Sequence, residues 1–170
     1  MEATTTTPEA QAAVRDFEAL AARDAAGMAA SYAEDAIADI VAVGVLRGSE
    51  EIKQFFESLF AAFTDMETTY DIVAASGNTV VVEWRSHGTF SGTAFQGIEP
   101  TGKQIDSRGV DIMKIENDRI AHNTAYYDGM AFARQIGMMP EQDSGPERAL
   151  KGAFNALTKA RRTIADRTGT

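Results

Sequence analysis

The chain contains no cysteine among its 170 residues, and this absence excludes several kinds of site. Disulfide bonds, thiolate metal ligands and cysteine nucleophiles all require that side chain. Histidine is scarce too, because His87 and His122 are the only two. They are poorly placed among carboxylates, whereas zinc and iron sites usually combine several such ligands. We therefore expect no metal site.

Basic residues are also in short supply. The chain has 16 basic and 25 acidic residues and a net charge of −9, which argues against nucleic acid or an anionic membrane as the main partner. No apolar run approaches the roughly 20 residues needed to span a bilayer. Residues 1–6, which we expect to be a disordered lead, lack the basic start and apolar core of a signal peptide. We expect a cytoplasmic protein that binds a small neutral or apolar molecule.

Common catalytic and nucleotide-binding motifs are missing as well. The sequence has no G-x-S-x-G, no phosphate-binding glycine loop and no dinucleotide fingerprint. The length fits a single domain with a substantial core, and the hydrophobic content of 44% is ordinary for a globular protein. We predict a domain over residues 8–140, followed by a linker and a helix over 141–170.

Helical signals occupy the first third of the chain. Thr7 can cap a helix that has Pro8 at its first position and runs to about Arg23. A short second helix is predicted after Gly27, and it faces Tyr32 inward. Ser49 is expected to cap a third helix. The inward face of this third helix is rich in aromatic residues: Phe55, Phe56, Phe60 and Phe63.

Strand signals dominate the middle of the chain. Residues 36–43 alternate, with Ile37, Asp39, Val41 and Val43 on one face. After Asp65 a period of two persists for about sixty residues. Gly77-Asn78 and Glu116-Asn117-Asp118 predict tight hairpin turns. Glycines within the strand patterns, at positions 88 and 109, predict bends or bulges where the sheet curls.

The last part of the chain is again helical. Asp128 is predicted to cap a short helix over about 129–137. After a linker, an amphipathic helix carries one apolar face, with the basic residues mostly off it: Leu150, Ala153, Phe154, Leu157 and Ile164 form the face, and Lys151, Lys159, Arg161 and Arg162 are the basic residues. We expect this helix to pack on its own domain or on a dimer partner. A helix lying on a membrane surface is the alternative.

Helices followed by a long antiparallel sheet predict an α+β protein. We expect a cone-shaped, strongly curved antiparallel sheet covered by the N-terminal helices, with the C-terminal amphipathic helix as an addition. A curled sheet closed by helices encloses a pocket, which is where small ligands usually bind.

The order and spacing of several short motifs between residues 88 and 140 resemble one known family. These are G-T-x-x-G, P-T-G-K, the strand G-V-D-I-M-K-I, Y-Y-D and Q-I-G. Over roughly residues 10–140 the chain resembles the SnoaL-like polyketide cyclase group of the nuclear transport factor 2-like superfamily. Members of this superfamily include cyclases, ketosteroid isomerases, dehydratases, epoxide hydrolases and non-catalytic binding domains, so the fold does not fix the reaction.

The resemblance implies a type of reaction and an oligomeric state. SnoaL-type cyclases close a ring by an intramolecular aldol reaction with an aspartate as acid/base and without metal or cofactor, so we expect no cofactor here. Aligning H-N-T-A-Y-Y-D onto the family's final strand puts Ala125 where the cyclases and the limonene epoxide hydrolases carry their acid. An alanine cannot move a proton, so the mechanism cannot be carried over unchanged. The resemblance also implies a homodimer.

Asp111 is the strongest candidate for a replacement acid/base. It interrupts the apolar strand G-V-D-I-M-K-I, where burial of a carboxylate raises its pKa toward the range useful for proton transfer. Asp39, if it lies across the cavity, would assist by like-charge repulsion. The alternative is that Asp111 only binds a buried tyrosine, tryptophan or arginine, such as Arg85 or Arg108, and that Asp39 faces solvent.

Strand periodicity also selects candidate ligand contacts. If Ala125 faces the pocket, Asn123 and Tyr127 share its face, whereas His122, Thr124 and Tyr126 point away. The full set of predicted ligand contacts is Asn123, Tyr127, Trp84, Ser86, Tyr32 and Phe56. His87 could reach the cavity mouth.

Two functions follow from these candidates. The first is a cofactor-independent enzyme of the cyclase, isomerase or epoxide hydrolase kind, acting on a mostly apolar, polyketide-like molecule. The second is a non-catalytic small-molecule-binding domain of the same fold, which Ala125 favours. A module that binds only protein is a weaker third possibility.

Overall fold

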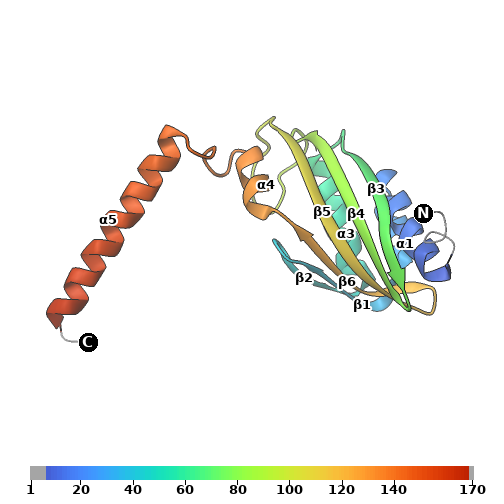
Figure 1. The fold of residues 1–170 in the computed structure, drawn as a ribbon. Helices are drawn as coiled ribbons and strands as arrows, with labels where there is room; N and C mark the ends of the chain where they lie inside the picture. Colours follow the sequence, from blue (N-terminus) through green and yellow to red (C-terminus); the bar gives the residue numbers. More distant parts are fainter. Residues whose placement is uncertain (1–6, 169–170) are drawn as a thin grey trace.

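The computed structural model describes residues 7–168, so the lead predicted for residues 1–6 lies outside the described range. In chain order the elements are α1 (Pro8–Ala21), α2 (Ala25–Ser31), β1 (Tyr32–Ile40), β2 (Gly44–Arg47), α3 (Gly48–Ala62), β3 (Glu67–Ser76), β4 (Thr79–Thr89), β5 (Gln104–Glu116), β6 (Arg119–Tyr127), α4 (Gly129–Gln135) and α5 (Gly145–Thr168). The predicted α+β class is confirmed (Figure 1).

The strands form one curved sheet in the order β2-β1-β6-β5-β4-β3. Each neighbouring pair runs antiparallel except β1 and β6, which run parallel in the middle of the sheet. The predicted curved sheet is therefore found, but it is mixed, because one of its pairs is parallel and the prediction described an antiparallel sheet. The parallel pair arises because β1, which directly follows α2, pairs with β6, a strand made about ninety residues later. Strand periodicity does not reveal which strands pair.

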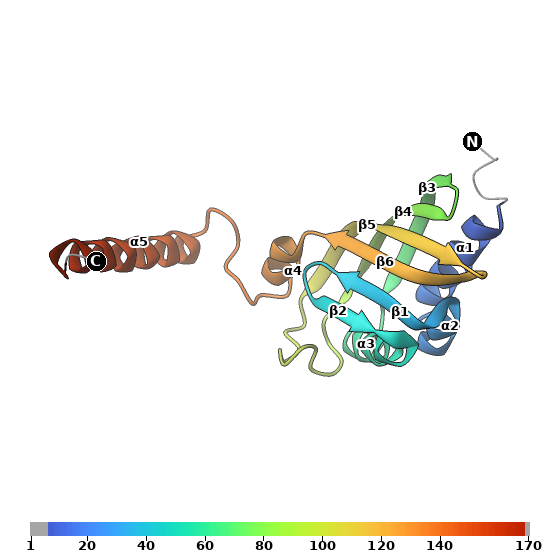
Figure 2. The same ribbon diagram turned by 90° about the horizontal axis from the view of Figure 1, so that it is seen from below.

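Helices α1, α2 and α3 lie on one side of the sheet, which curls around them (Figures 1 and 2). The core between these layers joins Ala13 and Phe17 of α1 to Val80, Val82 and Met113 of the sheet. A second core cluster, built around Phe63 and Phe90, lies beneath α4 at the other end of the space between the helices and the sheet. The concave side of the sheet is therefore apolar.

Two helix starts were predicted correctly and two were not. The Thr7 hydroxyl accepts a hydrogen bond from the Ala10 N–H at 3.1 Å, as a cap of α1 should. Asp128 likewise caps α4, with its carboxylate 2.9 Å from the Ala131 nitrogen. However, α2 begins before Gly27, because the Asp24 carboxylate accepts from the Gly27 N–H and caps the helix earlier.

The Ser49 cap and the strand over residues 36–43 also need correction. Helix α3 begins at Gly48, and the Glu51 carboxylate accepts from the Arg47 N–H at 2.6 Å in place of a serine cap. Strand β1 ends at Ile40, so residues 41–43 form a turn into the short strand β2. The predicted hairpin turns after β3 and β5 are confirmed, and Asn117 and Asp118 both adopt positive φ angles.

Gly109 marks a close approach, and of the predicted bend or bulge the bulge is absent there. It pairs in regular register with Trp84, and a Cβ atom at position 109 would lie 2.5 Å from the indole ring. Gly88 is similarly in register and packs against the backbone of Met66. The register shifts of the sheet lie elsewhere, between Ile72 and Ala74 for example. Glycine at 109 therefore lets the indole lie flat over the sheet beside Asp111.

Helix α5 extends away from the body of the molecule (Figures 1 and 2). Its first turn is attached to α4, because Glu147 accepts a hydrogen bond from Arg134 at 2.8 Å. Within α5, Glu147 also accepts from Lys151 at 2.9 Å. The Lys151 hydrogen bond, with help from the Asp143 N–H and Arg134, lowers the pKa of Glu147 to about 2. Within residues 7–168, none of the helices is long and apolar enough to cross a membrane.

Candidate active site

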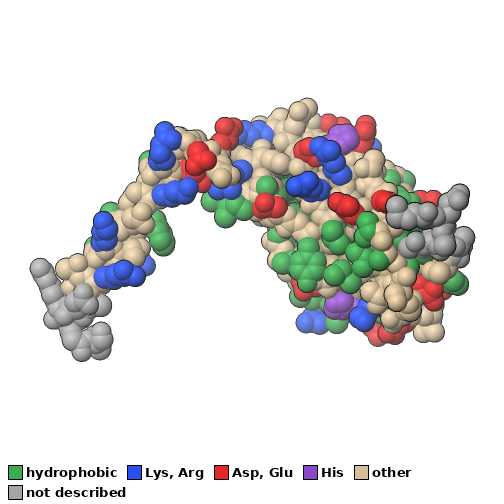
Figure 3. Space-filling model, viewed as in Figure 1, with side chains coloured by type: hydrophobic (Ala, Val, Ile, Leu, Met, Phe, Trp, Pro, Cys, Tyr) green, Lys and Arg blue, Asp and Glu red, His purple; other side chains and the backbone are tan. Residues whose placement is uncertain are grey.

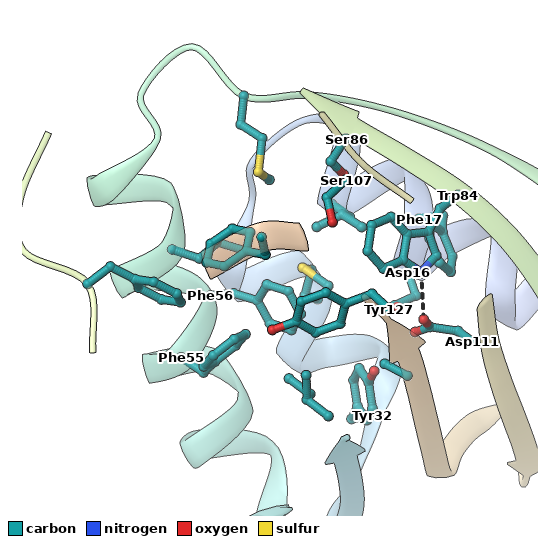
Figure 4. A pocket seen from close by; sticks show the side chains of 18 residues that line it. Asp16, Phe17, Tyr32, Phe55, Phe56, Trp84, Ser86, Ser107, Asp111 and Tyr127 are labelled. Atoms are coloured by element: carbon teal, nitrogen blue, oxygen red, sulfur yellow. Dashed lines mark hydrogen bonds between the residues drawn. The ribbon is translucent and has the colours of Figure 1, made fainter. Parts of the chain in front are cut away.

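A cavity lies between the concave face of the sheet and helices α1, α2 and α3 (Figure 4). Its volume is about 110 Å³, whereas one water molecule needs about 10–15 Å³ by the same measure. The walls are largely aromatic and aliphatic: they include Phe17, Leu20, Met28, Phe55, Leu59, Phe95 and Phe132. Such a lining suits an apolar small molecule that a few polar groups orient.

Asp111 of β5 projects into this apolar cavity. Its side chain is 7% exposed, and its two oxygens accept different hydrogen bonds. Trp84 Nε1 donates to Oδ1 at 2.7 Å, and Asn123 Nδ2 donates to Oδ2 at 2.6 Å. Burial raises the pKa of Asp111 to about 6, although the hydrogen bonds from Asn123 and Trp84 act in the opposite direction. The carboxyl group is therefore held in place and titrates close to neutrality.

Asp16 of α1 is a second buried carboxyl group at the same end of the cavity (Figure 4). It is 2% exposed, and its Oδ1 has no hydrogen-bond partner among the described residues. Burial, followed by the negative charge of Asp111, raises the pKa of Asp16 well above its usual value. A carboxyl group whose pKa is raised in this way favours its protonated form, in which it can donate a hydrogen bond.

Sequence reasoning missed Asp16, although a signal was present. The helix over residues 8–21 buries Ala12, Ala13 and Phe17, and Asp16 lies on the same face at helical spacing. Burial raises the pKa of a carboxyl group in an apolar helical stripe just as it does in an apolar strand. Asp16 was not predicted as a candidate because only the apolar residues of this helix were assigned to its buried face.

Tyr32 and Asn123 connect the polar groups at this end of the cavity. Asn123 Nδ2 donates to the Tyr32 hydroxyl at 3.2 Å as well as to Asp111. Burial raises the pKa of Tyr32 well above its usual value, and the charges of Asp16 and Asp111 add to this. Asn123 is not among the residues that line the cavity, whereas Tyr32 and Asp111 are. The amide therefore orients Asp111, and the contact between Asn123 and a ligand stays a prediction.

The other predicted ligand contacts lie at the cavity wall. Trp84 and Ser86 of β4, Tyr127 at the end of β6, Tyr32 and Phe56 all line it. Burial raises the pKa of the Tyr127 hydroxyl. These positions agree with the predicted faces of the strands, whereas a contact with a ligand stays a prediction for each residue.

Asp39 lies on the opposite face of the sheet, so the prediction that it projects into the cavity is wrong. In the parallel register between β1 and β6, Ala38 pairs with Asn123 and Ile40 pairs with Ala125. Those residues share the concave face, and Asp39 pairs with Thr124 on the convex face. The phase of β1 was misread because its alternation of Ile, Asp and Val suits either face.

The two histidines lie outside the cavity. His87 is exposed and lies 3.2 Å from Glu67, and His122 contacts the hydroxyl of Thr124 at 3.3 Å on the convex side. Arg85 pairs with Asp106 on the surface, so it is not the buried partner considered for Asp111. Within the described range, no group of three or more histidine and acidic side chains could hold a metal ion.

Comparison with known proteins gives the family. The model of the SnoaL-like polyketide cyclase family matches residues 11–136, which is most of the chain. The chain belongs to this family. No curated protein matches it.

Solved structures share the fold at low sequence identity. A candidate SnoaL-like polyketide cyclase from Jannaschia sp. CCS1 superposes with a TM-score of 0.70 and 20% identity, covering 82% of this chain and 97% of that one. The candidate polyketide cyclase IdmH from Streptomyces antibioticus gives a TM-score of 0.63 and 22% identity, with 76% and 98% coverage. The candidate hydroxylase AclR from Streptomyces galilaeus gives 0.68 and 15%, with 90% and 96% coverage. These likenesses establish a nuclear transport factor 2-like fold.

Proposed function

We propose that this protein is a cofactor-free enzyme of the cyclase or isomerase type, acting on a small, mostly apolar, polyketide-like molecule. The observation that carries the proposal is Asp111, a buried carboxyl group held in an apolar cavity with a pKa of about 6. General acid/base catalysis is most efficient when the pKa of the catalytic group lies near the working pH. Membership of the SnoaL-like family supports the same class of reaction.

In this proposal the ionised Asp111 removes a proton from a carbon next to a substrate carbonyl group. The resulting enolate carbon attacks a second carbonyl carbon of the same molecule, which forms the ring bond and leaves an alkoxide. Asp111 then returns its proton to the alkoxide oxygen, so ring closure requires no net gain or loss of protons. In an isomerase the proton returns to a different carbon of the same substrate.

In this scheme Asp16 acts in its protonated form, which its raised pKa favours. Its carboxyl group lines the cavity next to Asp111 and can donate a hydrogen bond to the carbonyl oxygen on which charge develops. Donors aimed at developing charge in a site that excludes water are among the largest contributions to catalysis. The Tyr32 hydroxyl, which also lines the cavity, can assist in the same way.

The experiment compares Asp111→Asn with Glu116→Gln on a panel of open-chain polyketide-like diketones and of cyclic enones. Glu116 is an exposed carboxylate near the end of the same strand, so its variant controls for a change of charge. We expect Asp111→Asn to lower kcat by a factor of about 10² to 10⁴, and Glu116→Gln to retain wild-type turnover. Equal turnover in wild type and Asp111→Asn would remove Asp111 from the mechanism.

A non-catalytic small-molecule-binding domain is the second candidate function. It is favoured by Ala125 at the position of the family's acid and by the hydrogen bonds that engage both oxygens of Asp111. On this alternative the panel molecules bind to the cavity and are recovered unchanged. Binding measured by calorimetry, together with product analysis of the same mixtures, separates the two functions.

A further inference from the structure

The cavity wall contains a second group of polar side chains, Ser86 of β4 and Ser107 of β5, apart from the group around Asp111. The two serines are partners in the antiparallel register, so their Cβ atoms lie about 5 Å apart on the same face of the sheet. Figure 4 shows them next to each other and away from Asp111. Polar groups in a largely apolar wall are the ones that fix the orientation of a ligand.

The two serine hydroxyls retain hydrogen-bonding capacity. The Ser86 hydroxyl lies 2.7 Å from the hydroxyl of Thr68, its partner on β3. Whichever of the two donates, Ser86 keeps a free lone pair, because a hydroxyl has one proton and two lone pairs. The half-buried Ser107 side chain has no hydrogen bond within the described part of the chain, so its hydroxyl can both donate and accept.

The serines lie at a fixed separation from the carboxyl end of the cavity. Asp111 and Ser107 are four residues apart on β5, which places their Cα atoms about 13 Å apart on the same face. Between them lies the row formed by Trp84 and Gly109, where the indole ring approaches the glycine closely. The cavity therefore has two polar ends with an aromatic floor between them.

The middle of the cavity suits a flat apolar group. Phe17, Trp84 and Tyr127 all line it, and the rings of Trp84 and Tyr127 lie 6.3 Å apart at an interplanar angle of 49°. Aromatic rings attract other rings in offset or edge-on arrangements. Hydrogen bonds of about 2.8 Å at each polar end leave a length comparable to that of two fused rings.

The cavity offers no positive charge to a ligand. Lysine, arginine and histidine side chains are visible on the outer surface of the molecule (Figure 3). Within residues 7–168, none of them lines the cavity, whereas Asp16 and Asp111 do. Burying an unpaired carboxylate or phosphate costs several kcal/mol or more. The serines can therefore receive a neutral oxygen group, but not an anionic one.

We propose that Ser86 and Ser107 form a distal subsite that binds a neutral carbonyl or hydroxyl oxygen of the substrate. The reacting carbonyl group lies at the opposite end, beside Asp111 and Asp16, and this placement rests on the proposed function. The subsite selects an elongated, flat, uncharged molecule with oxygen at both ends and an apolar middle. Ser86 and Ser107 are thus specificity-determining residues that take no part in proton transfer.

A purely structural role accounts for only one of the two serines. Ser86 and Thr68 form a cross-strand hydroxyl pair of the kind that stabilises sheets. Ser107 makes no comparable contact with a described residue, although it lies directly opposite Ser86. Substitution of Ser107 therefore removes the subsite and leaves the hydrogen bonds of the sheet in place.

The test compares two ketones that differ by one hydroxyl group. Acetylnaphthalene carries a single oxygen, and acetylnaphthol carries in addition a hydroxyl on the ring far from the acetyl group. Binding of each to the wild-type protein is measured by calorimetry. We expect acetylnaphthol to bind about five- to tenfold more tightly, which corresponds to one net hydrogen bond.

Ser107→Ala should abolish this preference. We expect the ratio of the two affinities to fall below about twofold, with the affinity for acetylnaphthalene unchanged, because only the contact with the distal hydroxyl is lost. Ser86→Ala should lower the ratio as well. Ser58→Ala is the matched control, because it removes an exposed serine hydroxyl of α3 that lies outside the cavity, and it should keep the wild-type ratio.

A charged analogue tests the stated chemistry of the ligand. Acetylnaphthoate, with a carboxylate in place of the distal hydroxyl, should bind the wild-type protein about tenfold more weakly than acetylnaphthol, or not at all. Tighter binding of acetylnaphthoate would overturn the proposal, because the subsite would then be selective for anions.

The remaining outcomes also decide the proposal. Equal weakening of both ketones by Ser107→Ala would assign to this serine a structural role only. A preference for acetylnaphthol that survives in Ser107→Ala but disappears in Asp111→Asn would place the hydroxyl at the carboxyl end, and absence of binding of both ketones would exclude the proposed class of ligand. Either result would overturn the subsite.

These binding measurements do not depend on turnover. If Asp111→Asn left turnover unchanged while Ser107→Ala lost the preference for acetylnaphthol, the proposed reaction would fail and the distal subsite would stand. If Asp111→Asn lowered turnover while Ser107→Ala kept the wild-type ratio, the subsite would fail and the reaction would stand.

Discussion

Asp111 lies directly opposite Ala125 in the register between β5 and β6. Residues paired in this way have Cβ atoms about 5 Å apart on the same face of the sheet. Both residues line the cavity, and the small side chain of Ala125 leaves space beside the carboxyl group of β5.

The only tryptophan of the chain reports on this carboxyl group, because Trp84 Nε1 donates to Asp111 Oδ1. We predict that tryptophan fluorescence titrates with a midpoint near the Asp111 pKa of about 6. Asp111→Asn retains an oxygen that accepts from the indole but cannot titrate, so its fluorescence should be flat in this range. A flat curve for the wild type would mean that Asp111 does not change its charge near neutrality.

Stability should fall as the pH rises through the same range. The pKa of Asp111 is about 6 in the folded protein and about 3.9 in an unfolded chain, so the folded state binds the proton more tightly. The contribution of Asp111 to the free energy of unfolding is full below about pH 4 and decreases by about 3 kcal/mol as the pH rises past 6. Urea denaturation at a series of pH values measures it.

The control for this pH dependence is again Asp111→Asn. The difference between wild type and variant isolates the contribution of Asp111 from those of Asp65 and Asp106, whose pKa values are lowered and which act in the opposite direction. A difference that is constant from about pH 4 to pH 7 would contradict the prediction.

Gly109→Ala should disturb the site through Trp84. A Cβ atom at position 109 would meet the indole ring and the Tyr126 carbonyl oxygen, both at 2.5 Å. The ring must shift, and its hydrogen bond to Asp111 lengthens. We expect a loss of about 1–3 kcal/mol in the free energy of unfolding and an altered tryptophan emission.

Gly152→Ala is the matched control for this substitution. Gly152 lies in α5 with no atom within 4 Å of the added methyl group, so the change should leave Trp84 emission as it is. If Gly109→Ala also left emission and stability unaltered, the close approach between Gly109 and Trp84 would not exist in solution.

The Asp128 cap should contribute measurably to the free energy of unfolding. Asp128→Ala removes the acceptor of the Ala131 N–H and should lower the free energy of unfolding by about 1 kcal/mol. Asp128→Asn, which keeps an oxygen in the same place, should restore most of this loss. Equal losses in both variants would assign the effect to charge and not to the hydrogen bond.

The sequence predicted well those features that depend on local chemistry. Caps such as Thr7 and Asp128 and the turn at Asn117-Asp118 follow from short-range hydrogen bonds and allowed φ angles, and all were found. The face of Asp111 followed from strict alternation in β5, which has buried partners at Met113 and Ile115. The family followed from the order of its motifs.

Features that depend on distant parts of the chain were harder to predict. Asp39 was assigned to the wrong face because the phase of β1 is set by its pairing with β6, and not by its own residues. Asn123 was predicted to contact a ligand, but it is not among the residues that line the cavity and instead donates to Asp111 and Tyr32, which come from other strands. Asp16 joins the site only because α1 packs across the sheet.

The parallel seam between β1 and β6 has a consequence for how the protein acquires its shape. β1 is made early in synthesis and must wait for β6, which is nearly the last part of the body to be made. Until then the hydrogen-bonding edge of β1 is open, and such long-range pairing is slow to form. Completion of that seam brings Tyr32 to Asn123, so the polar end of the cavity cannot be assembled before β6 has been made and has paired with β1.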